Sequence, residues 1–470
     1  MSKERALKNI KLRMDPVLDD ADTLDGQSRI CNWLSNTLLE LAEKHRAEYI
    51  QTQNKKSAEI VYSPRGLRNL LPALKEQHPF LRVVHSSPLK NTALRLSKSI
   101  EAHQKSKKGK RKGKEVGWPK FKAWSRSWYS LFYDEPGKGF KVEKDLLILS
   151  LGRGKDRSLR YLLIPLVEAK VLEGAEIRTL RIIKELGVFY AVFTVRVSVP
   201  QRKPITKVIA LDPNHKNLAY GVDTEKTGIE IVAPIWLKAS DRRMDELRSL
   251  RDHCQRKSQK IPVVDEHGQS TGKTYWKPSK RWEKRNRVLE RMLRKRREQT
   301  KTFLYTTAHA LYAKYDCVGI GDYAPHGDGI TTKMRRAMNN RSLIGRFKEV
   351  LSWVACKSGK TFLKYKEKGT TRTCHPCGCV VEGGLAPSIR RWRCPSCSSE
   401  NDRDENAAQN GLREVLRELS KKCETFVSQV SGSDLVHVDE RWVWRVLPGG
   451  VLQTPRRQKQ RVNRGARKLK

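Results

Sequence analysis

Four cysteines stand in two closely spaced pairs, which form the strongest chemical signal in the sequence. Each pair has the pattern Cys-x2-Cys, residues 378–393 separate the pairs, and the members are Cys374, Cys377, Cys394 and Cys397. Each pair can place two thiolates on one tight turn, and two such turns facing each other complete a tetrahedral Zn²⁺ site. Because four thiolates leave no open position for water, we expect a structural ion. Two weaker rival ligands lie in the same segment, His375 and Cys379.

Two carboxylates are the next candidates for chemistry, one at the end of a strand and one at the start of a helix. Asp212 closes the apolar run VIAL, where an acid loses hydration and needs a compensating cation. Asp404 lies in NDRDENAAQNGL at the start of a predicted helix, where it could equally be a simple helix cap. Carboxylates that bridge two Mg²⁺ ions about 3.5–4 Å apart form a phosphodiester-cleaving site. The order of the elements around the two acids is more specific than either acid alone.

Aromatic and basic residues are interleaved in GWPKFKAWSRSWYSLFY, directly after the basic segment 101–116. Rings interleaved with cations suit base stacking combined with phosphate pairing, although strands also bury such rings for packing. This stretch supplies four candidate nucleic-acid-binding residues, Trp118, Lys120, Phe121 and Lys122. A second basic segment, 279–301, adds three candidates, Arg281, Arg285 and Arg294.

The charge of the chain indicates the class of its partner. The 470 residues carry 96 Lys and Arg against 51 Asp and Glu, a formal net charge of +45. Such an excess destabilises a compact fold unless a polyanion is bound, so we expect nucleic acid as the partner rather than a small metabolite. No apolar run approaches the about 20 residues that span a bilayer, so no membrane partner is expected. Five of the ten cysteines lie in residues 374–397, which favours a metal and a reducing compartment over a disulfide framework.

Hydrophobic periodicity predicts a multidomain α+β chain that could position these groups. Residues 1–100 show mostly helical spacing, whereas 146–197 alternate as strands. In one of these strands a single face would hold Phe189, Ala191, Phe193, Val195 and Val197. Residues 207–223 predict a strand, a turn and a second strand, and residues 240–260 and 279–315 predict two long basic helices. A buried strand over 315–325, an amphipathic helix and the strand TFLKYKE precede the cysteines, and from Ser431 onward we expect an irregular, disordered tail.

Taken together and in this order, the motifs resemble the TnpB group of transposon-encoded RNA-guided nucleases and the compact type V CRISPR effectors. The resemblance covers residues 90–415. GWPKFK is similar to the glycine-x-proline-x-phenylalanine-lysine signature, and IALDPNHKNLAYGVD is similar to the first RuvC motif. TTRTCHPCG, RWRCPSC and DRDENAAQN resemble the zinc ribbon and the third RuvC motif. The resemblance implies that Asp212 and Asp404 are catalytic acids.

One strand departs from the family pattern, because Gly321 precedes Asp322 where most members have a glutamate before the aspartate. Three interpretations follow. In one branch of the family the glutamate comes from the next strand, which here would be Glu367, and neighbouring parallel strands do end at one edge of a sheet. Alternatively, Asp322 itself reaches the metal. In the third interpretation the site is inactive, and the protein is an RNA-guided binder that does not cleave.

The resemblance implies an RNA-guided DNA endonuclease that binds a guide RNA and a double-stranded DNA target, reads a short flanking duplex motif and uses two Mg²⁺ ions. Its expected fold is a helical recognition region plus a β-barrel-like wedge domain, then an RNase H-like (RuvC) α/β domain with an inserted zinc ribbon. The expected boundaries are 1–205 for the wedge domain with a helical insertion at roughly 20–115, 206–373 for RuvC, 374–397 for the ribbon, 398–430 for the last RuvC helix and 431–470 for the basic tail. A prokaryotic, cytoplasmic, nucleoid-associated location is expected. The alternatives are a nuclease-dead RNA-guided repressor or recruitment module, and a plain nucleic-acid-binding protein with a zinc ribbon.

Overall fold

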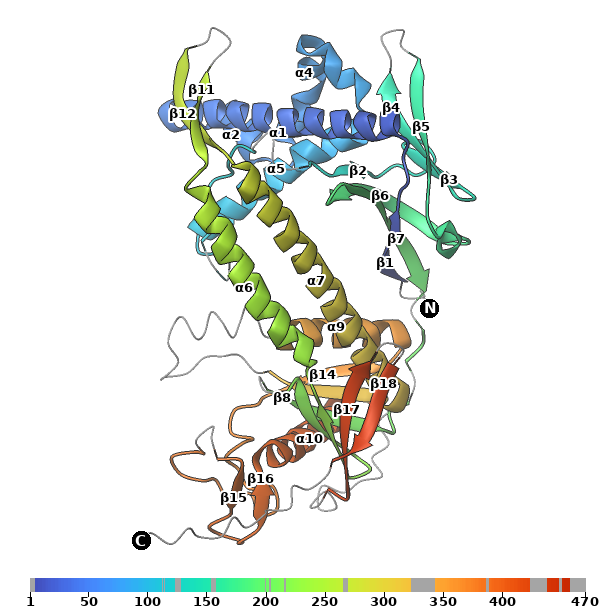
Figure 1. Ribbon diagram of the computed structural model, residues 1–470, viewed down its shortest axis with the longest axis vertical. Coiled ribbons are helices and arrows are strands. Elements are labelled where there is room, and N and C mark those ends of the chain that lie inside the picture. The colour runs from blue at the N-terminus through green and yellow to red at the C-terminus, as the bar shows by residue number, and fades with distance from the viewer. Residues whose placement is uncertain are drawn as a thin grey trace. The chain divides into compact units, whose positions relative to one another are not determined.

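The computed structural model describes residues 5–111, 113, 115–122, 128–153, 158–198, 200–202, 204–214, 217–264, 269–322, 343–385, 389–422, 438–447 and 450–456. The chain divides into two compact units, Met1–Ser198 and Val199–Lys470, whose helices and strands are labelled in Figure 1. Across the part of the chain that is described, no helix is both long and apolar enough to cross a membrane.

The first unit combines a group of helices with two antiparallel sheets. Its helices are α1 (Leu18–Thr52), α2 (Lys55–Tyr62), α3 (Gly66–Asn69), α4 (Leu71–Gln77), η1 (Pro79–Val83), α5 (Ser86–Lys107) and η2 (Ala169–Leu172). One sheet has the strand order β1 (Arg5–Arg13), β7 (Val188–Ser198), β6 (Glu176–Glu185) and β2 (Leu131–Tyr133). The other has the order β3 (Phe140–Glu143), β4 (Leu146–Arg153) and β5 (Leu159–Pro165).

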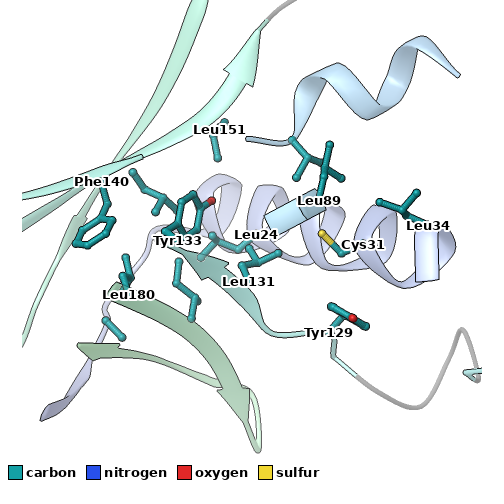
Figure 2. Close-up of a cluster of buried hydrophobic side chains, with 14 of the residues drawn as sticks. Leu24, Cys31, Leu34, Leu89, Tyr129, Leu131, Tyr133, Phe140, Leu151 and Leu180 are labelled. Carbon is teal, nitrogen blue, oxygen red and sulfur yellow. The ribbon is translucent and has the colours of Figure 1, made fainter. Parts of the chain in front are cut away.

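The core of the first unit forms where the apolar stripe of α1 meets these strands. Leu24, Cys31 and Leu34 recur at helical spacing and are fully buried. They pack in one cluster with Leu131 and Tyr133 of β2, as Figure 2 shows. Strand β7 alternates between buried and partly buried residues, as its sequence predicts, because successive side chains of a strand point to opposite faces.

The second unit is built on a seven-stranded sheet. Its strand order is β14 (Thr361–Tyr365), β13 (Cys317–Gly321), β8 (Val208–Pro213), β9 (Ala219–Asp223), β10 (Thr227–Ile231), β17 (Glu440–Leu447) and β18 (Gly450–Pro455). Its helices are α6 (Ile235–Gln255), α7 (Lys280–Lys314), α9 (Ile344–Ser358) and α10 (Arg403–Lys422). Two small hairpin sheets complete it, β11 (Gln259–Val264) with β12 (Ser270–Lys277) and β15 (Arg391–Arg393) with β16 (Glu400–Asp402).

Three parallel strands, β8, β13 and β14, end at the same edge of this sheet. Leu211 pairs with Ile320, and Gly321 pairs with Tyr365, so the residues that follow the three strands lie next to one another. Helix α10 packs across these strands, and a Cβ on Gly319 would overlap the side chain of Val415 in that helix. The missing side chain therefore lets the helix approach the sheet closely.

The expectation of an irregular tail from Ser431 is wrong for residues 440–447 and 450–455, which form β17 and β18. Strand β17 pairs in parallel with β10 and buries Val443 and Trp444. The partner strand of β17, β10, lies far away in the sequence, so no local pattern shows that the two strands pair. The basic residues after 456 lie outside the described residues. A smaller correction concerns the first basic helix, which ends at Gln255 rather than near 260, because β11 begins at Gln259.

Candidate active site and metal centre

The structure brings three sequence-predicted acids to one edge of the seven-stranded sheet. Asp212 is 6% exposed near the end of β8, Glu367 follows β14, and Asp404 is the second residue of α10. Burial, and then the negative charges of Glu367 and Asp404, raise the pKa of Asp212 well above its usual value, while Arg403 opposes the shift. Like charges this close favour a bound cation, because a cation offsets both the lost hydration and the repulsion.

Gly321 and Glu367 fit together as a pair. A Cβ built on Gly321 would lie 2.6 Å from Oε2 of Glu367 and 3.1 Å from Cδ of Pro213. Contacts shorter than about 3 Å are repulsive between such atoms, so the carboxylate of Glu367 occupies the space that a side chain at position 321 would need. Gly321 departs from the family pattern in β13, and Glu367 follows the next strand, β14. These two observations are thus one structural feature.

Asp322, the alternative second acid, contacts the backbone beside Glu367. Its carboxylate accepts a hydrogen bond from the backbone N–H of Glu367 at 3.0 Å. Its own N–H donates to the carbonyl of Tyr365 at 2.9 Å. The buried Lys348 of α9 is close enough that the charges of Glu367 and Asp322 partly offset the lowering of its pKa by burial. Asp322 therefore holds the chain at the point where the side chain of Glu367 leaves it.

Asp404 is held by a capped helix start and by an arginine that sequence reasoning missed. The carboxylate of Asp402 accepts hydrogen bonds from the N–H groups of Asp404 and Glu405, which are otherwise unsatisfied at a helix N-terminus. Arg390 donates to both carboxylate oxygens of Asp404, at 3.0 and 3.3 Å. The run IRRWRC offers three arginines before the second cysteine pair, and nothing in their local spacing singles out Arg390.

A second ion pair braces the same helix start from the C-terminal strands. Arg441 of β17 donates through Nε and Nη2 to the two carboxylate oxygens of Glu405, each at 2.8 Å. The hydroxyl of Tyr220 donates to the same carboxylate at 3.0 Å. A little farther along, Arg456 lies 3.5 Å from the carboxylate of Asp402. The strands expected to be a disordered tail therefore help to position the turn that carries the third acid.

The four cysteines of the two Cys-x2-Cys pairs converge, and their geometry fits a zinc ion. Their Sγ atoms all lie within 4.8 Å of one another. The Sγ–Sγ distances are 3.7 Å for Cys374 and Cys397 and 3.6 Å for Cys377 and Cys394. Tetrahedral Zn–S bonds of about 2.3 Å imply sulfur separations of about 3.8 Å, so the donor set suits the ion. The rival ligands His375 and Cys379 are not members of this cluster.

Among the aromatic candidates, the structure separates packed side chains from exposed ones. Trp118 is half-buried, with the ring of His103 edge-on at 5.5 Å and the guanidinium of Arg46 4.3 Å above it. Phe121 is 48% exposed, and Lys120 beside it is also exposed. Lys122 is half-buried and exchanges two backbone hydrogen bonds with the side chain of Asn36.

The candidate arginines lie along α7, which packs beside α6 (Figure 1). Arg281 is exposed, whereas Arg285 and Arg294 are half-buried. Arg285 donates to the carbonyl of Leu250 in α6 at 2.7 Å, so it ties the two helices together. A nucleic-acid role is thus open to Arg281, while Arg285 already has a structural one.

Comparisons with known proteins agree with this description. Residues 345–410 match the family model "Cas12f1-like, TNB domain". TnpB-like protein L79 of Acanthamoeba polyphaga mimivirus is 29% identical over 150 residues, which are 31% of this chain and 28% of L79. The CRISPR-associated DNA-binding protein Cas12m of Allomeiothermus silvanus is 31% identical over 147 residues, which are 28% of this chain and 26% of that protein. The matched region thus spans less than a third of either relative.

A solved structure extends the likeness to most of the chain. Cas12f1 in its complex with sgRNA and target DNA aligns with 86% of this chain and 98% of its own, with a TM-score of 0.52 and 12% identity. At this identity the match concerns the fold alone, and that fold is a multidomain α+β architecture. The family model, the curated relatives and the fold together confirm that this chain resembles the TnpB-like proteins and the compact type V effectors.

Proposed function

We propose that the protein is an RNA-guided DNA endonuclease of the RuvC type. The observation that carries the proposal is the placement of the Glu367 carboxylate against Gly321, with the charges of Glu367 and Asp404 acting on buried Asp212. Three carboxylates at one sheet edge suit divalent ions that activate water and stabilise the leaving oxygen of a phosphodiester. The net charge of +45 supplies the attraction that a guide RNA and a DNA target need.

Each acid would have its own supporting groups. Asp212 is buried at its strand end, and Asp322 holds the backbone from which Glu367 projects. Arg390 offsets the charge of Asp404 and could turn toward a phosphate once a cation binds that carboxylate. The four cysteines would hold a structural Zn²⁺ and so keep the segment that carries Arg390 beside the site. In this proposal the first unit holds the flanking duplex and the heteroduplex.

Cleavage by acid variants tests the proposal. The protein is purified with its co-expressed RNA and incubated with a matching plasmid and Mg²⁺. We expect Asp212→Ala and Glu367→Gln to abolish nicked and linear products, whereas Asp322→Asn keeps most activity. The exposed Glu382 of the ribbon supplies a control, Glu382→Gln, that should cut normally. Loss of cutting in the Asp322 variant, with normal cutting in the Glu367 variant, would identify Asp322 as the second acid instead.

A second candidate function is RNA-guided DNA binding without cleavage. It is supported by the substitution of Gly321 for the usual glutamate and by the similarity to a relative that is described as a DNA-binding protein. Tight binding to a target that matches the guide, without nicked or linear product at any Mg²⁺ concentration, would establish it. Purification without any discrete bound RNA would instead favour a plain nucleic-acid-binding protein. Sequencing of the RNA that co-purifies distinguishes the two RNA-guided functions from plain nucleic-acid binding.

A further inference from the structure

Three cations from separate parts of the first unit converge on one short segment. Arg95 of α5 and Arg181 of β6 both donate to Oγ of Ser130, at 3.1 and 3.0 Å. The guanidinium of Arg95 lies 4.5 Å from the centre of the Tyr129 ring, and Nζ of Lys122 lies 4.2 Å from that centre. In Figure 2, Tyr129 lies on the segment that leads into β2. All three cations are half-buried.

No carboxylate neutralises this group among the residues that the structure describes. None of the three cations has an ion pair there, and the side chain of Asp25, which faces the same sheet, is engaged by Lys184 at 2.5 Å and Trp128 at 2.7 Å. Residues 123–127, Ala-Trp-Ser-Arg-Ser, lie outside the described residues and contain no acid. The group therefore has three positive charges and no negative one.

This arrangement is unfavourable in the free protein. Burial and the charge of Arg95 lower the pKa of Lys122 to about 8, and the same two causes lower the pKa of Arg181. Cation–π contacts with Tyr129 and Phe132 and the shared hydroxyl of Ser130 relieve part of the cost, but neither supplies a counter-charge. Half-buried like charges of this kind are stabilised when an anion binds between them.

We propose that Arg95, Lys122 and Arg181, together with Ser130, form a binding site for a backbone phosphate of a nucleic acid. Two guanidinium groups, an ammonium and a hydroxyl match the oxygens of a phosphodiester, and the rings beneath them limit their movement. The cluster's geometry alone indicates a phosphate group. Only the assignment of that phosphate to a nucleic acid rests on the proposed function. The polymer is either the guide RNA or the target DNA.

The first test uses the free protein and inorganic phosphate. We expect phosphate to raise the Tm of the wild type more than that of Arg95→Gln or Arg181→Gln. The matched control is Arg178→Gln, which also removes one positive charge from β6. Arg178 is exposed and pairs with Glu176, so it is not part of the cluster. Without phosphate, the two site variants should be at least as stable as the control, because removing one cation relieves repulsion. A lower Tm in both, with no change in the phosphate effect, would assign the cluster a packing role and overturn the proposal.

The second test identifies the polymer through the salt dependence of binding. Each lost phosphate contact should reduce the slope of log K against log salt by about 0.7 for single strands or 0.9 for duplex DNA. We expect this reduction in Arg95→Gln and Arg181→Gln with either the co-purified RNA or the DNA target, and not in Arg178→Gln. A change confined to RNA assigns the site to the guide, and one confined to DNA assigns it to the target. Slopes equal to the control with both polymers would refute the site, whether or not the protein cleaves DNA. If one glutamine variant does not fold, Arg181→Lys replaces it. This variant keeps the positive charge, so its salt slope should fall by less than that of the glutamine variant that does fold.

Discussion

The pairing of Gly321 with Glu367 makes a sharp prediction for Gly321→Ala. The new methyl group would lie 2.6 Å from Oε2 of Glu367, so the carboxylate must retreat by about 0.8 Å to reach an ordinary contact of about 3.4 Å. Misplacement of a reacting or positioning group by about 1 Å can cost roughly 100-fold in rate. We therefore expect a loss of about that size in the rate of DNA cleavage. Because the clashing atom is the free end of a flexible side chain, the loss of stability should stay near the lower end of the about 1–3 kcal/mol range for overpacking.

The assay is single-turnover cleavage of a matching plasmid, with Tm measured in parallel. Gly345→Ala is the control, because Gly345 lies at the start of α9 with nothing within 4 Å of its Cβ position, and it should cut normally. The increase in Tm on addition of Mg²⁺ provides a readout that needs no cleavage, and it should shrink in Gly321→Ala alone. Wild-type cleavage and wild-type Mg²⁺ stabilisation in Gly321→Ala would refute the matched pair. A transfer of the acid, Gly321→Glu with Glu367→Gly, should recover part of the lost activity, since it restores the arrangement common in the family.

Three further predictions concern an ion pair beside the site, a carboxylate at the opposite end of the sheet and the metal centre. Arg441→Ala should lower stability in urea by about 1.5–3 kcal/mol, because it leaves the carboxylate of Glu405, 11% exposed, without its two charged hydrogen bonds; a variant as stable as the wild type would contradict this brace. Burial raises the pKa of Asp316, but hydrogen bonds led by that from Lys360 outweigh it and hold the pKa below its usual value. The stability that this carboxylate contributes is therefore present above its unfolded pKa of about 3.9 and is lost as the pH falls toward the folded pKa. The difference in free energy of unfolding between the wild type and Asp316→Asn should shrink below about pH 4. A constant difference from about pH 7 to about pH 2 would argue against this role of Asp316. Chelation should release one Zn²⁺ per chain by elemental analysis and lower the Tm, and a chain purified without zinc at full stability would refute the metal centre.

Features that depend on neighbouring residues were predictable from the sequence. The spacing of the cysteine pairs, the acid after an apolar strand, the alternation of β7 and the two long basic helices all follow from local pattern. The failures share a cause in long-range contact. Strand β17 exists because it pairs with β10, and the role of Arg390 depends on how the ribbon folds back on Asp404. Neither partner is visible in the local sequence.

By itself, the sequence determined the kind of chemistry the chain can perform, because residue types, charge and spacing along the chain set the available ligands. It left three interpretations of the missing glutamate. Only the tertiary structure decided which carboxylate fills the space beside Gly321, since that depends on strand β14 ending level with β13. It also decided which cations are neutralised and which are left without a counter-charge. Whether a cation is neutralised depends on distances between side chains from different elements, as Arg95 and Arg181 are brought together at Ser130.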